Sequence, residues 1–301
     1  MGDAQGLIDR ATALLDRIEA LLPAAPQATD WGCEAFRWRK GPRGGYLQGL
    51  REPHRQGLDD LLCLEQQMAA VEANTRQFLA GRSANNVLLW GSRGTGKSSL
   101  VKAIFTELRG AGLRLCEVAK GDLDDLPDIL DQVRHRPERF ILFCDDLSFG
   151  AGDSGYTSLK AALDGSISSA PDNLLIYATS NRRHLLPEPQ ADNRGAEWVD
   201  GEIHPGEGVE ERISLSDRFG LWVAFHPFSQ AEYLEIVRHW LHRLGAAIPQ
   251  GGQVERAALQ WALRRGSRSG RTAWQFARDW AGQAGWDPLS DPHQPDGCHL
   301  S

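Results

Sequence analysis

A glycine-rich stretch that ends in lysine and serine constrains the fold of this chain more than any other feature. Residues 91–98 read GSRGTGKS and fit the pattern GxxxxGK[ST] in full. Glycine tolerates positive φ, so consecutive backbone N–H groups can turn towards one anion. Lys97 adds a full positive charge, and the Ser98 hydroxyl can ligate Mg²⁺. The stretch therefore predicts a loop that binds the phosphates of a nucleotide.

The residues on either side support this prediction, because a phosphate-binding loop joins a strand to a helix. Residues 86–90, NVLLW, are strand-like, and residues 98–108 carry apolar side chains at helical spacing. The helix would begin near Lys97 and point its positive end at the same anion. We expect an exposed loop whose lysine contacts a triphosphate; a plain glycine turn with a surface lysine is the alternative. The predicted nucleotide-binding residues are Gly91, Ser92, Arg93, Gly94, Thr95, Gly96, Lys97, Ser98 and Ser99.

Two adjacent acids, Asp145 and Asp146, follow a second apolar run, FILFC at residues 140–144. Such a run is typical of a central parallel strand, and ligands bind at the carboxyl ends of these strands. We predict that Asp145 holds Mg²⁺ together with Ser98, and that Asp146 orients or deprotonates an attacking water. Capping of the next helix is the alternative. Many hydrolases of this type carry the longer glutamate at the second position, so Asp146 is consistent with slow hydrolysis.

Strand-like and helix-like segments alternate through the middle of the chain. This alternation predicts an α/β fold with a parallel five-stranded sheet flanked by helices. From about Ser229 the pattern is only helical and predicts a small all-helical lid domain. The strand candidates are residues 86–90, 113–118, 140–144, 174–179 and 221–225. The predicted divisions are 1–57 (an N-terminal helix at 7–22, then an irregular basic-aromatic arm), 58–227 (nucleotide-binding domain, opening with a helix at 58–80), 228–285 (lid) and 286–301 (disordered tail).

The predicted arm contains the sequence FRWRKGPRGGY, which interleaves basic and aromatic residues at positions 36–46. Cations beside aromatic faces can stack bases and neutralise phosphates, so nucleic acid binding is one interpretation. Packing of the arm onto the main domain and contact with another protein are the alternatives. Leu61 and Leu62 line an adenine pocket in one interpretation and pack in the core in another.

These motifs and their order resemble an AAA+ ATPase, and more specifically a bacterial AAA+ family still classed as a domain of unknown function. The resemblance spans residues 45–285 and rests on NVLLWGSRGTGKSSLVKA, EVAKGDLDDLPDIL, DDLSF, ATSNRRHLL, SLSDRFGL and SGRTAWQF. It implies ATP and Mg²⁺ as cofactors, ATP hydrolysis, and a homo-oligomer that acts as a mechanochemical switch on a protein client. The segment DDLSF is also similar to AAA+ replication initiators and helicase loaders, which hints at nucleic acid.

The resemblance implies three further site residues. Asn181 would position the attacking water, since an amide offers both a donor and an acceptor. Arg218 would be an arginine finger that reaches the γ-phosphate bound by a neighbouring subunit, since guanidinium stays charged and offers a planar fork. Arg271 matches the sensor arginine of the lid, with Arg268 as a competitor. Helix capping is the alternative for Asn181, and a salt bridge with Asp217 or another acid is the alternative for Arg218.

Composition limits the classes of function. The formal net charge of −7 argues against a global basic field for nucleic acid, although a local patch stays open. The 5 cysteines are scattered without a CxxC pair, which argues against a zinc site or a disulfide framework. We expect a cytoplasmic protein, with no membrane span and no signal peptide.

Two other functions remain open: a nucleotide-gated loader or scaffold with little turnover, and a P-loop kinase with a small-molecule acceptor. We find no aromatic-hydrophobic-glycine pore loop, which argues against polypeptide threading. The long acidic segment 187–212 precedes Arg218, and we expect it to become ordered when subunits assemble.

Overall fold

The computed structural model describes most of the chain between residues 28 and 283. The described residues are 6, 10–12, 14, 28–41, 44–53, 56–150, 153–164, 171–183, 185, 197–199, 202–204, 215–249 and 251–283. The predicted helix at 7–22 and the acidic segment 187–212 lie outside the described residues except for a few positions. The predicted tail at 286–301 lies wholly outside them.

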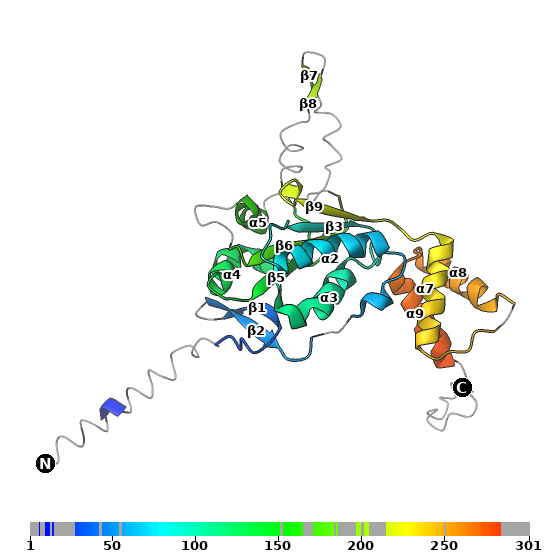
Figure 1. Cartoon of the computed structure of the whole chain (residues 1–301), viewed down its shortest axis with the longest axis horizontal. Helices are drawn as coiled ribbons and strands as arrows, with labels where there is room; N and C mark the ends of the chain where they lie inside the picture. The colour runs from blue at the N-terminus through cyan, green and yellow to red at the C-terminus, as the bar shows by residue number, and fades with distance from the viewer. Residues whose placement is uncertain are drawn as a thin grey trace, which may run out of the picture.

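A seven-stranded sheet forms the centre of the molecule, in the order β2-β1-β4-β5-β6-β3-β9 (Figure 1). Neighbouring strands are parallel except for the antiparallel pair β1–β2. The five predicted strands are confirmed and form the consecutive part β4-β5-β6-β3-β9. The bounds are Ala35–Gly41 (β1), Gly44–Leu50 (β2), Val87–Gly91 (β3), Leu113–Glu117 (β4), Arg139–Cys144 (β5), Leu174–Ser180 (β6) and Leu221–Phe225 (β9). The strands β7 (Glu197–Val199) and β8 (Glu202–His204) form a separate antiparallel pair.

The prediction of an irregular basic-aromatic arm is wrong for β1 and β2, which extend the sheet beyond the five predicted strands. The alternation of residue types is that of a strand, with successive side chains on opposite faces. Phe36 and Trp38 are both 1% exposed in the core, and the Trp38 indole donates to Asp125 at 2.8 Å. Arg37 pairs with Glu117 of β4 at 2.7 Å. The buried rings of Phe36 and Trp38 are not available to stack bases, so packing onto the domain is the supported interpretation.

Helices cover both faces of the sheet and make three layers (Figure 1). One hydrophobic cluster contains α2 and α3 with one face of the sheet, and a second contains α4 and α5 with the other face. β5 shows why a central strand is apolar throughout: Phe140, Leu142 and Cys144 belong to the second cluster, whereas Ile141 and Phe143 belong to the first. The helices are α2 (Glu65–Leu79), α3 (Lys97–Leu108), α4 (Leu126–Val133) and α5 (Ser154–Asp164).

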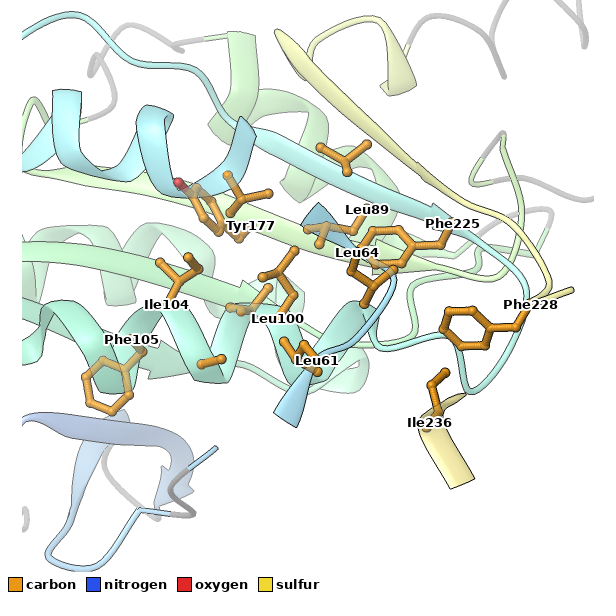
Figure 2. Packing of buried hydrophobic residues seen from close by; sticks show 14 of the residues in the cluster. Leu61, Leu64, Leu89, Leu100, Ile104, Phe105, Tyr177, Phe225, Phe228 and Ile236 are labelled. Carbon is orange, nitrogen blue, oxygen red and sulfur yellow. The ribbon is translucent and has the colours of Figure 1, made fainter. Parts of the chain in front are cut away.

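The segment before the phosphate-binding loop is not one continuous helix, as the sequence had suggested for 58–80. A short 3₁₀ helix, η1 (Leu58–Asp60), is followed by a turn, and α2 begins only at Glu65. The turn places Leu61 and Leu64 in the first hydrophobic cluster, between the sheet and the start of the lid (Figure 2). Two further 3₁₀ helices are η2 (Arg109–Ala111) and η3 (Lys120–Asp125).

The C-terminal part of the described chain is helical, as predicted, and is called the lid below. It consists of α7 (Gln230–Arg243), α8 (Gln253–Arg265) and α9 (Gly270–Gln283). Ser229 and Glu232 form a reciprocal capping box at the start of α7. Phe228 and Ile236 join the first hydrophobic cluster, so the lid packs on the same core as α2 and α3 (Figure 2). No helix among the described residues is both long enough and apolar enough to cross a membrane.

Candidate nucleotide-binding site

The loop between β3 and α3 contains two glycines in left-handed backbone conformations. Gly94 has a φ of 73° and Gly96 a φ of 102°, values at which other residues are strained. Gly96 precedes the first helical residue, so α3 begins at Lys97 as the sequence predicted. The first N–H groups of a helix lack partners within it and carry partial positive charge. The loop and the start of α3 therefore have the form of an anion site.

A third glycine, Gly91, fixes where the loop leaves the sheet. Its φ is 130°, and a Cβ atom at this position would lie 2.0 Å from the carbonyl oxygen of Phe225. The close approach allows the Ser92 N–H to donate to the same oxygen at 3.1 Å. Gly91 and Phe225 are also partners in the β3–β9 register. Only glycine lets the loop begin so close to the neighbouring strand.

The side chain of Lys97 folds back into the loop and is only 6% exposed. Its Nζ donates to the carbonyl oxygens of Gly91 at 2.9 Å and Ser92 at 2.7 Å, and to Oδ1 of Asn181 at 3.2 Å. These contacts match the three donors of an ammonium group. The expectation of an exposed loop is thus wrong for this side chain, because carbonyls of the loop itself attract the ammonium inward.

Burial lowers the pKa of Lys97 to about 8, because removal from water disfavours the charged form. Asp146 and Asp145 oppose this change by stabilising the ammonium, whereas Arg93 and Arg271 add to the lowering of the pKa. Lys97 is therefore still mostly charged at neutral pH but titrates just above it.

Asp145 lies beside the loop and accepts two hydroxyl hydrogen bonds on one oxygen. Ser98 Oγ donates to its Oδ1 at 2.5 Å, and Thr179 Oγ1 donates to the same atom at 2.6 Å. The sheet explains the second contact, because Cys144 of β5 pairs with Ala178 of β6 and the next residues are also adjacent. Ser98 and Asp145, each predicted as a metal ligand, are therefore in direct contact, and their role towards a metal stays a prediction.

Asp146 adopts a φ of 52°, which is unusual for a residue with a side chain. Its backbone N–H donates to Thr179 Oγ1 at 2.8 Å, and its Oδ1 accepts a hydrogen bond from Asn181 Nδ2. The Asn181 amide thus contacts Lys97 through its oxygen and Asp146 through its nitrogen. Asn181 links the predicted phosphate ligand to the predicted water-activating acid.

These residues surround a cavity of about 750 Å³ between the sheet edge and the lid. The predicted residues on its wall are Arg93, Gly94, Thr95, Gly96, Lys97, Ser98, Ser99, Asp145, Asp146, Asn181 and Arg271. Its apolar side chains are Leu61, Leu62, Leu64, Phe228, Ile236, Trp240 and Trp274. A cavity with charged and hydroxyl groups beside a glycine-rich loop and an apolar remainder has the composition of a nucleotide site. Gly91, Ser92 and Arg218 do not line it.

The lid reaches the loop through the beginning of α9. The Gly270 N–H donates to the carbonyl oxygen of Gly94 at 2.9 Å, and the neighbouring Arg271 lines the cavity. Arg268, the competitor for the sensor role, instead lines a second hollow of about 690 Å³ beside Arg93. The geometry therefore favours Arg271 over Arg268 as the lid residue that would meet a phosphate.

Arg218 lies apart from the cavity and its guanidinium forms an ion pair with Asp164 at the end of α5. A salt bridge with Asp217 or another acid was the alternative to the arginine-finger interpretation. The acid that pairs with Arg218 in the structure is Asp164. Arg218 does not line the cavity of its own chain. The finger role stays a prediction.

Sequence reasoning gave no role to Thr179 or to two tryptophans of the cavity. Trp240 of α7 and Trp274 of α9 contact each other with ring centroids 4.5 Å apart. Trp274 follows Arg271 by three positions, so the two lie on the same side of α9. That spacing was the available signal for Trp274. The polar run from Thr179 to Asn181 at the end of a predicted strand marked the position of Thr179, but its contacts depend on the register between β5 and β6.

The donors at the loop fit Mg²⁺ rather than a metal held by protein alone. Ser98 and Asp145 offer oxygen atoms, and magnesium in phosphate sites uses one or two carboxylates with the phosphates and waters. In the described part of the chain, no group of three or more His, Cys, Asp or Glu residues could hold a metal ion. Ser98 and Asp145 are the residues that would hold it.

The sheet order and the phosphate-binding loop are those of the AAA+ P-loop fold. Orc1 of Aeropyrum pernix, solved in complex with DNA, matches with a TM-score of 0.51 at 13% identity over 74% of this chain and 60% of that one. A mutant of Thermotoga maritima RuvB matches with a TM-score of 0.49 at 19% identity over 75% of this chain and 65% of that one. The chain thus spans less than two thirds of both proteins, and these likenesses concern the fold alone.

The chain belongs to the family described as "Protein of unknown function (DUF815)", whose model matches residues 32–284. No curated protein matches the chain by sequence.

Proposed function

We propose that this protein binds ATP with Mg²⁺ in the cavity between the phosphate-binding loop and the lid, hydrolyses it, and acts as an oligomeric switch on a client. The observation that carries the proposal is the 2.5 Å hydrogen bond between Ser98 and Asp145. It brings a hydroxyl at the start of α3 and the carboxylate that follows β5 together as oxygen donors beside Lys97. The AAA+ fold motivates adenosine as the nucleoside.

The residues divide the work as follows. Lys97 exchanges its contacts with the Gly91 and Ser92 carbonyls for phosphate oxygens, since an ammonium prefers the stronger negative charge. Mg²⁺, when bound by Ser98 and Asp145, neutralises negative charge on the phosphates. Lys97 would also leave Oδ1 of Asn181 when it moves to the phosphates. The amide oxygen of Asn181 would then be free to contact a water.

Asp146 is proposed as the group that orients or deprotonates this water. It is exposed, lines the cavity and is held by Asn181. A general base needs to be within hydrogen-bond reach of the proton it removes, and Asp146 and Asn181 line the same cavity and contact each other. Arg271, from the lid, is proposed to contact the phosphates on the opposite side.

Arg218 is proposed to act on the nucleotide of a neighbouring subunit, which would make hydrolysis depend on assembly. Its ion pair with Asp164 then stores the guanidinium in a defined place when no neighbour is present. Such a residue supplied by another subunit stabilises transition-state charge only in the assembled protein.

A nucleotide-gated loader with little turnover is the second candidate. It is favoured by one observation: the Asp146 carboxylate already has a partner in Asn181, and aspartate reaches less far than glutamate. In this case nucleotide binding alone would change the position of the lid, and hydrolysis would only reset it.

The test measures ATP affinity and phosphate release on the same samples, with Mg²⁺ and with EDTA. We expect Lys97→Ala to abolish binding, and Asp146→Asn to keep affinity within about threefold while turnover falls by about 10²-fold or more. Full binding with no release above background in the unmodified protein at any concentration would favour the gated loader. Absence of binding would refute both candidates.

A further inference from the structure

The hydroxyl group of Thr179 contacts both acids of the site at once. It donates its proton to Oδ1 of Asp145 at 2.6 Å and accepts the backbone N–H of Asp146 at 2.8 Å. A hydroxyl has one proton and two lone pairs, so these two bonds fix its rotation. Thr179 is 1% exposed, and the bonds are therefore made without competition from bulk water.

The backbone of Thr179 holds the same turn at a third point. Its carbonyl oxygen accepts the N–H of Leu147 at 2.7 Å. Thr179 is thus bonded to three consecutive residues after β5, and the middle one, Asp146, has the unusual φ of 52°. Such a backbone conformation persists where surrounding contacts determine it, and here one residue supplies two of them.

Ser98 shares the carboxylate oxygen of Asp145 but does not hold Asp146 in the same way. Its hydroxyl comes from the first turn of α3, whereas that of Thr179 comes from the sheet. Oγ1 of Thr179 therefore links the Asp145 carboxylate to the Asp146 backbone N–H, in addition to the peptide bond that joins the two residues.

We propose that Thr179 is a positioning residue that couples Mg²⁺ binding at Asp145 to the placement of Asp146. The inference rests on the proposed function, since it assigns Asp145 to the metal and Asp146 to the water. Thr179 touches neither the metal nor the nucleotide in this scheme and acts only through the two acids.

A buried threonine elsewhere in the fold provides a matched control for a merely structural role. Thr75 of α2 is 0% exposed, and its hydroxyl contacts the Val71 carbonyl at 2.7 Å and the Tyr177 hydroxyl at 2.8 Å. Thr75→Val removes a hydroxyl of the same kind, with the same number of hydrogen bonds, from a part of the core that does not line the cavity.

The experiment compares the full-length protein with its Thr179→Val, Thr179→Ser and Thr75→Val variants. ATP affinity is measured in EDTA and in saturating Mg²⁺, and phosphate release is measured at saturating ATP. For Thr179→Val we expect the ATP affinity in EDTA to be unchanged. The factor by which Mg²⁺ increases ATP affinity should fall by about tenfold or more, and turnover should fall by about 10–100-fold. Thr179→Ser keeps the hydroxyl and restores both quantities, and Thr75→Val leaves both near those of the unmodified protein.

The outcomes separate this inference from the proposed function. If the unmodified protein binds ATP and Thr179→Val equals it in Mg²⁺ response and turnover, the coupling is refuted and the proposed function stands. Equal losses in Thr75→Val and Thr179→Val, or no rescue by serine, would also refute it, because they indicate general destabilisation. If Thr179→Val does not fold by circular dichroism, Thr179→Ala replaces it with the same expectations. An unmodified protein without ATP affinity refutes the inference and the proposed function together.

Discussion

The Ser98 hydroxyl donates to Oδ1 of Asp145 at 2.5 Å, although the two residues are 47 positions apart in the sequence. The contact arises because α3 begins at the edge of the sheet where β5 ends. Neighbouring parallel strands present their carboxyl ends at one edge, and the phosphate-binding loop leaves the sheet there. The geometry follows from the fold, and the pair of oxygen donors gives the site its predicted chemistry.

The first prediction concerns Ser98→Ala. Loss of the hydroxyl removes one proposed magnesium ligand, so the gain in ATP affinity on adding Mg²⁺ should fall by about 10–100-fold, while affinity in EDTA stays unchanged. Titration of ATP at fixed Mg²⁺ concentrations measures this difference. Thr106→Ala is the control, since Thr106 lies on the same helix, donates to the Lys102 carbonyl and does not line the cavity. An undiminished response to Mg²⁺ in Ser98→Ala would argue against metal binding at this hydroxyl.

The second prediction concerns the pH dependence of ATP binding. The pKa of Lys97 is lowered to about 8, and phosphate binding requires the ammonium form. Affinity should therefore decrease as the pH rises above about 8, by up to about tenfold per pH unit. Isothermal titration between neutral and alkaline pH measures it. In Lys97→Arg the side chain stays charged over this pH range. The ATP affinity of this variant should therefore not decrease with pH in the same way.

The same pKa predicts the opposite trend for stability without nucleotide. Lysine has an ordinary pKa of 10.5, so between about 8 and 10.5 the unfolded chain binds more protons at Lys97 than the folded chain does. The free energy of unfolding should rise with pH across this window relative to that of Lys97→Met. If the free energy of unfolding changes with pH in the same way in both proteins, the prediction is wrong, and Lys97 is not buried in solution as it is in the structure.

The third prediction concerns Arg218→Ala. ATP affinity should stay within about threefold, because Arg218 does not line the cavity of its own chain, while assembly-dependent turnover falls by about 10³-fold. Mixing Arg218→Ala with Lys97→Ala should restore part of the activity, since each supplies what the other lacks. Asp164→Asn distinguishes an arginine finger from a structural ion pair with Asp164. The variant should retain turnover if Arg218 is a finger. It should lose turnover, as Arg218→Ala does, if only the ion pair matters. Mixtures without recovered activity would contradict action between subunits.

The fourth prediction compares two glycine-to-alanine substitutions. A Cβ atom at Gly91 would lie 2.0 Å from the Phe225 carbonyl oxygen, whereas Gly112, with φ of 94°, has nothing within 4 Å of such an atom. Gly91→Ala should reduce the free energy of unfolding by about 3 kcal/mol or more, and Gly112→Ala by about 1–2 kcal/mol for backbone strain alone. Urea titrations measure both. Similar losses in the two variants would show that β9 can move away from the loop at little cost.

The sequence predicted the parallel strands and the loop because their signals are local. An apolar run such as residues 140–144 is long enough to identify a buried strand, and GSRGTGKS specifies backbone conformation residue by residue. That Ser98 and Asp145 lie close together was also predictable, since both belong to motifs whose relative position the fold fixes, whereas their direct hydrogen bond was not.

The features that the sequence did not reveal depend on contacts between distant segments. The alternation of Phe36, Arg37 and Trp38 was visible, but its partner strand β4 lies far along the chain, and the segment was predicted to be an irregular arm. The burial of Lys97 follows from the folding of the loop onto itself. The role inferred for Thr179 depends on a strand register that no local pattern encodes.

The measurement that tests the account most directly is ATP affinity, with and without Mg²⁺, for the unmodified protein and Lys97→Ala. The account predicts that the unmodified protein binds ATP, that Mg²⁺ strengthens the binding, and that Lys97→Ala binds under neither condition while its circular dichroism spectrum stays that of a folded protein. An unmodified protein without affinity at any Mg²⁺ concentration, or a folded Lys97→Ala variant of unchanged affinity, would contradict it.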